Sequence, residues 1–167
     1  MKKTIISLIA AAALLTAPAF AQTEVVPASN PDELFTSADP QLHANKQVAY
    51  HIIRDLLEAN QWDKASQYIA DDYIQHNPNA ADGLDAVVEF FTQVLKVEPT
   101  PIPETISFPV VEVMAEGDLV TVISRREAEG PNGPYTTAWF DTWRIRDGKA
   151  VEHWDPALIN EAPDLTP

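Results

Sequence analysis

The chain contains no cysteine among its 167 residues. Without cysteine it has no disulfide bonds, so its fold must rest on a hydrophobic core. The same absence excludes catalysis by a thiol and any metal site built from thiolates.

Basic residues are scarce as well. The sequence has 11 lysines and arginines against 25 aspartates and glutamates, which gives a formal net charge of −14 at pH 7. Such a surface repels nucleic acids and anionic lipids, and no basic patch offsets the repulsion. We therefore expect neither a nucleic acid nor a membrane as a partner.

Long apolar runs are missing, apart from residues 5–15. A helix that crosses the ~30 Å core of a bilayer needs about 20 apolar residues, so this run is too short. Two lysines precede it, and Ala-Phe-Ala at 19–21 follows it, which is typical of a secretory signal peptide. We predict that residues 1–21 are a signal peptide and that the protein is exported to the periplasm or the extracellular medium.

The remaining chain has the length of one ordinary domain. Residues 22–38 are rich in proline, alanine, serine and acid, which predicts a flexible linker with one helical turn near residues 31–35. The domain itself is expected over residues 39–158, and residues 159–167 are expected to form a C-terminal tail.

Apolar spacings of three and four residues predict helices in the first half of the domain. Asp39 as a cap and Pro40 in the first turn open a helix that runs to residue 60. A short helix over 63–69 and a third over 84–98 follow. The Asn-Pro sequence at 77–78 predicts a loop that carries His76.

Beyond residue 99 the apolar period becomes that of β-strands. Strands are predicted over 105–114, 119–128, 135–146 and 149–155, and the short turns between them indicate antiparallel neighbours. Helices followed by strands indicate an α+β domain in which a curved, mostly antiparallel sheet wraps round a helical layer.

The last two strands form a hairpin that turns near residues 146–149, and two registers compete. A two-residue type I′ loop places Thr142 opposite His153. A three-residue loop with a G1 bulge at Gly148 shifts every pair by one and places Asp141 opposite His153. We favour the bulged register because it gives the cleaner division of faces.

In that register one face carries a histidine, two carboxylates and a wall of large side chains, because side chains alternate along a strand. This face would hold Trp139, Asp141, Trp143, Val151, His153 and Asp155. The opposite face would hold Thr142, Arg144, Ala150 and Glu152.

Several motifs occur in order between residues 45 and 156: Tyr-Ile-Gln-His-Asn-Pro at 73–78, Phe-Phe at 90–91, Ala-Glu-Gly-Asp-Leu-Val at 115–120, Asp-x-Trp-Arg at 141–144, Asp-Gly-Lys at 147–149 and Glu-His-Trp-Asp at 152–155. As a set, these motifs resemble the SnoaL-like branch of the nuclear transport factor 2-like superfamily. The resemblance implies a cone-shaped α+β fold that encloses one apolar pocket, usually in a homodimer. Relatives include polyketide cyclases that perform an intramolecular aldol closure, steroid isomerases, dehydratases and members that only bind ligands.

Catalysis in this family rests on pocket carboxylates and histidines. The positions that match are His153 and Asp155, with Asp141 across the hairpin and His76 from the loop. The residues expected to contact substrate are Tyr73, Asn77, Trp139 and Trp143.

The chemistry that these residues can support is enolisation. A carboxylate against an aromatic wall can take a proton α to a carbonyl, while an imidazole hydrogen-bonds the developing enolate oxygen. Asp141 or Asp155 would be the base, and His153 or His76 the electrophile. Structural alternatives stay open: Asp141 and His153 can form a satisfied buried pair, Asp155 can end its strand by accepting a backbone N–H, and His76 can fix its loop.

Two other functions also stay open. His76, His153 and one of the two aspartates could form a two-His-one-carboxylate metal site, although the spacing matches no known metal signature, and we predict no metal or other cofactor. The protein could instead bind a small molecule without chemistry. The expected partners are a small apolar or aromatic carbonyl compound and a second copy of the chain, docked through Phe140 and Trp154 on the outer face of the sheet.

Overall fold

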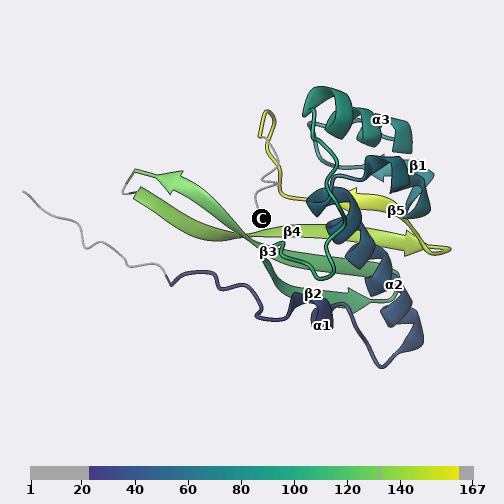
Figure 1. The fold of residues 1–167 in the computed structure, drawn as a ribbon, viewed down its shortest axis with the longest axis horizontal. Coiled ribbons are helices and arrows are strands. Elements are labelled where there is room, and N and C mark those ends of the chain that lie inside the picture. Colours follow the sequence, from purple (N-terminus) through teal and green to yellow (C-terminus); the bar gives the residue numbers. More distant parts are fainter. Residues whose placement is uncertain (1–22, 132, 162–167) are drawn as a thin grey trace, which may run out of the picture.

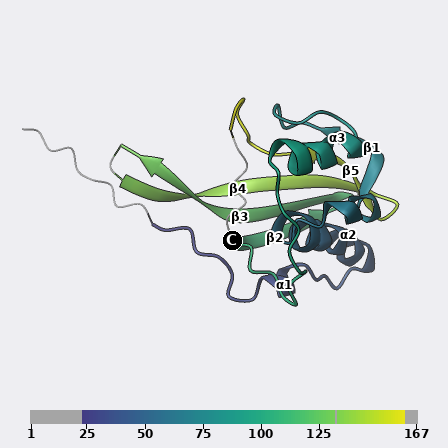
Figure 2. The same ribbon diagram turned by 45° about the horizontal axis from the view of Figure 1, so that its top comes forward.

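The computed structural model describes residues 23–131 and 133–161. The predicted signal peptide and the last six residues of the predicted tail therefore lie outside the described residues. Within them, the chain forms a curved, open sheet of five strands with helices across one face (Figures 1 and 2). The predicted α+β class, with its cone-shaped arrangement, is confirmed.

The helical elements precede almost all of the strands. They are α1 (Pro31–Leu34), α2 (Pro40–His51), the π-helical η1 (Ile52–Glu58), the 3₁₀-helical η2 (Trp62–Gln67), α3 (Leu84–Glu89) and the π-helical η3 (Phe90–Val94). The strands are β1 (Ile69–Gln75), β2 (Val110–Glu116), β3 (Leu119–Gly130), β4 (Gly133–Arg146) and β5 (Lys149–Trp154). Their order across the sheet is β1-β5-β4-β3-β2. Within residues 23–131 and 133–161, no helix is both apolar enough and long enough to cross a bilayer.

The long first helix begins where the sequence predicts. Asp39 caps it, because its Oδ1 accepts hydrogen bonds from the backbone N–H groups of Gln41 (2.8 Å) and Leu42 (3.0 Å). Pro40 follows at the first helical position, where a missing N–H costs nothing. The helix continues through η1, and the chain reverses at Asn60, whose φ is +55°.

The segment predicted as a flexible linker takes part in the core. Phe35 is completely buried, and its ring meets that of Tyr50 edge to face at 5.4 Å. Further upstream, the N–H of Ala28 donates to the carbonyl oxygen of Val110 in β2 at 2.8 Å. Residues near Phe35 therefore belong to the folded domain, which corrects the predicted boundary at residue 39.

Strand β1 lies where a loop was predicted. It runs parallel to β5, with Gln75 opposite His153, and the N–H of His76 continues the ladder by donating to the carbonyl oxygen of His153 at 3.0 Å. A register shift between Ile69 and Ile74 interrupts the apolar alternation that marks a strand, which explains why sequence periodicity misses it.

The β4–β5 turn corrects the predicted register. Asp147 and Gly148 have φ values of +52° and +76°, and Arg146 pairs with Lys149. This is the two-residue type I′ geometry that Asp-Gly favours, because its twist matches that of the flanking strands. The three-residue bulged turn is therefore wrong.

A bulge does occur in this hairpin, but farther from the turn. Ile145 pairs with Ala150 and Arg144 with Glu152, so Val151 is the extra residue of β5. His153 consequently lies opposite Trp143, and neither Asp141 nor Thr142 is its direct partner. Ala150 is completely buried beside Ile145 and does not point away from the core as predicted.

Candidate active site

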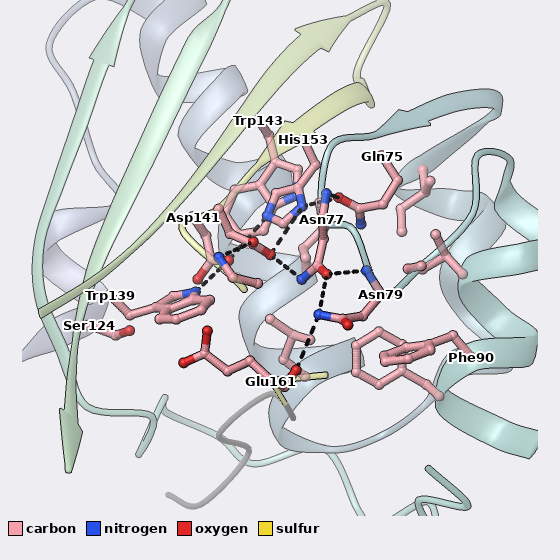
Figure 3. Close-up of a pocket in the computed structure, with 18 of the residues that line it drawn as sticks. Gln75, Asn77, Asn79, Phe90, Ser124, Trp139, Asp141, Trp143, His153 and Glu161 are labelled. Carbon is pink, nitrogen blue, oxygen red and sulfur yellow. Dashed lines mark hydrogen bonds and ion pairs between the residues drawn. The ribbon is translucent and has the colours of Figure 1, made fainter. Parts of the chain in front are cut away.

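A cavity of about 110 Å³ lies between the sheet and the helices α3 and η3 (Figure 3). This is several times the ~15 Å³ that one water molecule requires, so the cavity can take part of an organic ligand. Its helical side is apolar and aromatic, with contributions from Trp62, Val87, Phe90 and Phe91. The rings of Trp62 and Phe91 stack with their centroids 3.9 Å apart.

All but one of the predicted site residues line this cavity. They are Tyr73, Asn77, Trp139, Asp141, Trp143, His153 and Asp155. Because β4, β5 and β1 are neighbours in the sheet, residues that are up to 82 positions apart in the chain come together. Despite the different register, His153 and Asp141 share a face, since Asp141 is two residues before the partner of His153.

His76 is the exception. Its side chain is 44% exposed, its Nε2 lies 2.9 Å from Oε1 of Glu152, and its ring stacks on Trp154 at 5.2 Å. Glu152 also accepts a hydrogen bond from Nε of Arg144 at 3.0 Å. The hydrogen bonds with His76 and Arg144 lower the pKa of the Glu152 carboxyl group, and His76 has the larger effect. His76 therefore belongs to a surface cluster outside the cavity, and the two-His-one-carboxylate metal site is not assembled.

The hydrogen bonds around His153 fix the position of one hydrogen on its ring. Oε1 of Gln75 accepts the backbone N–H of Asn77 at 3.0 Å, so this atom is an acceptor, and it lies 2.8 Å from Nδ1 of His153. Nδ1 must therefore carry a hydrogen. The other ring nitrogen, Nε2, lies 3.1 Å from Oδ1 of Asp141. Nε2 is therefore the ring nitrogen that faces the carboxylate of Asp141.

The described residues hold Asp141 at one of its two carboxylate oxygens. Its Oδ1 contacts His153 and accepts the indole N–H of Trp139 at 3.3 Å. Its Oδ2 receives no hydrogen bond from residues 23–131 or 133–161. The ring of Trp143 stacks on the imidazole at 5.1 Å and restrains it from the side. Oδ2 is therefore the oxygen that Asp141 can offer to a ligand.

Asp155 is bonded at both oxygens. Its Oδ2 accepts the side-chain N–H of Asn77 at 2.7 Å, and its Oδ1 accepts the backbone N–H of Ala157 at 2.9 Å. The second contact is the one expected of a residue that ends its strand. Asp155 thus fixes the loop after β1 to the turn after β5, and it is less available than Asp141 to take a proton.

Tyr73 supplies a neutral hydroxyl group to the same cavity. Its side chain is buried, and burial raises the pKa of the phenol, as do the nearby charges of Asp141 and Asp155; a hydrogen bond from Trp143 acts in the opposite direction and does not outweigh them. The phenol therefore stays protonated and can donate its O–H.

Asp141, His153 and Asp155 also form the one group with metal-ligand chemistry among the described residues, with ligand atoms within 4.8 Å of one another. The hydrogen bonds of His153 oppose such a role. Nδ1 carries a hydrogen and Nε2 faces Asp141, so a cation would have to displace one of these contacts. The arrangement suits proton transfer better than metal binding.

Sequence reasoning missed the residues that close the cavity. Asn79 donates from Nδ2 to the carbonyl oxygen of Leu158 (2.8 Å), and its Oδ1 accepts the N–H of Asn160 (2.7 Å). Nη1 of Arg126 lies 2.7 Å from Oε1 of Glu161. The segment 156–161, half of which was predicted to be a tail, is therefore fixed against the cavity. Gln75 and Asn79 could have been noticed only as polar residues flanking the Asn-Pro sequence.

The curved sheet, the helices across it and the enclosed cavity with one polar wall define a nuclear transport factor 2-like pocket protein. A sequence profile of the SnoaL-like domain matches residues 51–153, which is more than half of the chain. The protein belongs to the SnoaL-like family, and the predicted resemblance is confirmed.

Solved structures show the same fold. A protein of Bacillus cereus ATCC 10987, described as a candidate polyketide cyclase, aligns with a TM-score of 0.52 and 15% identity over 80% of this chain and 90% of its own. A candidate SnoaL-like polyketide cyclase of Jannaschia sp. CCS1 aligns with a TM-score of 0.51 and 17% identity, over 72% and 91% of the two chains. Comparison with curated proteins gave no match.

Proposed function

We propose that this protein binds a small carbonyl compound in its cavity and abstracts a proton from the carbon next to the carbonyl, with Asp141 as the base. The observation that carries the proposal is the hydrogen bonding of the His153 ring, which sets the ring nitrogen that faces Asp141. Because Gln75 fixes the hydrogen on Nδ1, the imidazole presents Nε2 to Asp141, and one carboxylate oxygen is left for the ligand.

In the proposed step, Oδ2 of Asp141 takes the α-proton. The electron pair of the broken C–H bond forms the enolate, whose charge develops on the carbonyl oxygen. The O–H of Tyr73 donates a hydrogen bond to that oxygen, and the proton on Asp141 can return to a different atom. Depending on the ligand, the enolate would be reprotonated, attack a second carbonyl group or expel a β-hydroxyl group.

His153 acts through Asp141 and is a positioning residue. Its hydrogen bond to Oδ1 holds the carboxylate, and the stacked Trp143 limits its rotation. The apolar helical wall keeps the reacting atoms in a low-dielectric environment, where fixed hydrogen bonds to a developing charge are stronger than in water.

Hydrogen–deuterium exchange of a simple ketone tests the proposal. We would incubate 4-oxo-4-phenylbutanamide with the protein in D₂O and follow the signal of the CH₂ next to the ketone by NMR. The wild type should accelerate exchange, and Asp141→Asn should reduce the rate by about 10²–10⁴-fold, the usual contribution of a positioned base. Tyr73→Phe should reduce it by about 10²-fold, as expected for one oxyanion donor.

The matched control is Asp72→Asn, the same substitution at a side chain that is 77% exposed. It should exchange the ketone at the wild-type rate. If the wild type binds the ketone without accelerating exchange, the protein is a binding module and the catalytic proposal is wrong.

We also propose export and a homodimer. The signal-like sequence of residues 1–21 supports export, and removal of these residues from the mature protein in periplasmic or culture fractions would test it by mass spectrometry. Phe140 and Met114 are 45% and 52% exposed, and Phe140 lies on the outer face of the sheet, away from Trp139 and Asp141. Covering such side chains with a second copy would remove apolar surface from water.

A further inference from the structure

We propose that Arg126 forms a subsite for a carboxylate of the ligand, and that Glu161 occupies this subsite when no ligand is bound. The inference rests on the proposed function only in placing a carbonyl group at Asp141. It adds the chemical class of the ligand, a small keto acid.

Arg126 lies on the same face of the sheet as the catalytic residues. Side chains alternate along β3, so Arg126 shares the concave face with Ser124, whose cross-strand partner is Trp139. Arg126 lines the cavity, and its side chain is 16% exposed. Arg125 also lines the cavity, but it is the next residue along β3 and so belongs to the other face of the strand, where its Nη2 pairs with Glu24 and Glu127 at 2.8 and 2.9 Å.

One indole ring connects the subsite to the base. The guanidinium of Arg126 lies over the ring of Trp139, 4.3 Å from its centroid, while Nε1 of the same ring donates to Asp141. The cavity thus has a cation over the face of Trp139 and a proton acceptor at its N–H edge. A ligand that satisfies both groups carries a carboxylate and an enolisable carbonyl.

A carboxylate already binds at this position. Oε1 of Glu161 lies 2.7 Å from Nη1 of Arg126, and Figure 3 shows the Glu161 side chain at the cavity beneath Trp139. The Glu161 side chain is 30% exposed and belongs to the segment 156–161, which Asn79 holds through backbone atoms. A ligand carboxylate that replaces Glu161 would meet the same guanidinium nitrogen, so one charged contact of Arg126 is exchanged for another of the same kind.

The net charge of −14 makes this local cation important. The field of an acidic protein opposes the approach of an anion, and an anionic ligand needs a fixed positive group to bind in preference to its neutral analogue. Arg is suited to this role because its planar guanidinium donates in a fixed geometry that matches a carboxylate.

The test compares two ligands of nearly the same shape, 4-oxo-4-phenylbutanoate and its amide, by calorimetry at about 0.15 M salt, where the Debye length is about 8 Å. The wild type should bind the acid more tightly than the amide. Arg126→Gln should weaken the acid by about ten- to a hundredfold, as expected for loss of a charged hydrogen bond, and remove the preference. Glu161→Gln removes the competing carboxylate of Glu161 and should strengthen binding of the acid relative to the amide.

Arg146→Gln is the matched control, because this side chain is 61% exposed and pairs with Asp72 on the surface. It should keep the wild-type preference. If Arg126→Gln does not fold, Arg126→Lys and Glu161→Gln carry the test: the lysine variant should retain part of the preference for the acid. Equal binding of acid and amide by the wild type and by Glu161→Gln overturns the subsite.

The two proposals can fail separately. A preference for the acid without deuterium exchange supports the subsite and overturns catalysis. Exchange of the amide without a preference for the acid supports catalysis and overturns the subsite. If neither compound binds to any folded variant, both proposals are wrong.

Discussion

Substitutions that break the Asp141–His153 pair should show how much this pair contributes to the free energy of unfolding. The two side chains are 12% and 8% exposed, and their contact of 3.1 Å lies in the buried wall of the cavity. Replacing His153 with alanine leaves the Asp141 carboxylate, among the residues that the structure describes, with only the indole N–H of Trp139. Removing one member of a buried ion pair costs about 3–5 kcal/mol, so His153→Ala should lose stability in that range.

The second substitution separates charge from shape. Asp141→Asn keeps the size of the side chain but removes its charge. In the wild type it should destabilise the fold by about 1–3 kcal/mol, because a charged hydrogen bond is lost. In the His153→Ala background it should instead restore about 1–2 kcal/mol, because the charge that it removes has no cationic partner there.

Urea unfolding of the wild type, both single variants and the double variant closes this cycle, with the free energy of unfolding obtained by linear extrapolation. The reasoning fails if Asp141→Asn has the same effect in both backgrounds. It also fails if His153→Ala loses less than about 1 kcal/mol, which would mean that the pair is solvated at the cavity wall and contributes little to folding.

Three further predictions concern other parts of the fold. Phe35→Ala should cost about 3–5 kcal/mol in urea melts, because the ring is completely buried; a loss below about 1 kcal/mol would restore the linker interpretation. The pKa of Glu152 is lowered, first by His76 and then by Arg144, so its contribution to stability is present above the ordinary carboxyl pKa and is lost as the pH falls through the lowered value. Between about pH 5 and pH 2 the urea midpoint should therefore fall further in the wild type than in Glu152→Gln, which keeps only the loss from other carboxyl groups such as Asp55; equal losses would contradict the prediction. Light scattering at micromolar concentration should give a dimer mass for the wild type and a monomer mass for Phe140→Asp, whereas a monomeric wild type would rule out the dimer.

Much of the candidate site follows from local alternation. Trp139, Asp141 and Trp143 share a face in any register, because side chains two residues apart in a strand point the same way. The contact between Asp141 and His153 therefore forms even though the predicted turn is wrong. The type I′ turn and the bulge at Val151 shift the pairing by two positions relative to the prediction, which preserves the face and changes only the partner.

The sequence by itself determined the features that depend on a few neighbouring residues: the Asp39 cap, the change from helical to strand period, and the faces of β4. Only the tertiary structure decided the rest. Strand β1 pairs with β5 across more than 70 residues, so its existence depends on a partner that no local pattern names. That pairing brings Gln75 to His153 and turns His76 to the outside, and the packing of the segment 156–161 brings Glu161 to Arg126. Contacts between distant segments depend on how the whole core is buried, which no short stretch of sequence encodes. A bulge such as the one at Val151 shifts the pairing of two strands by one residue, and the local sequence carries no signal of that shift.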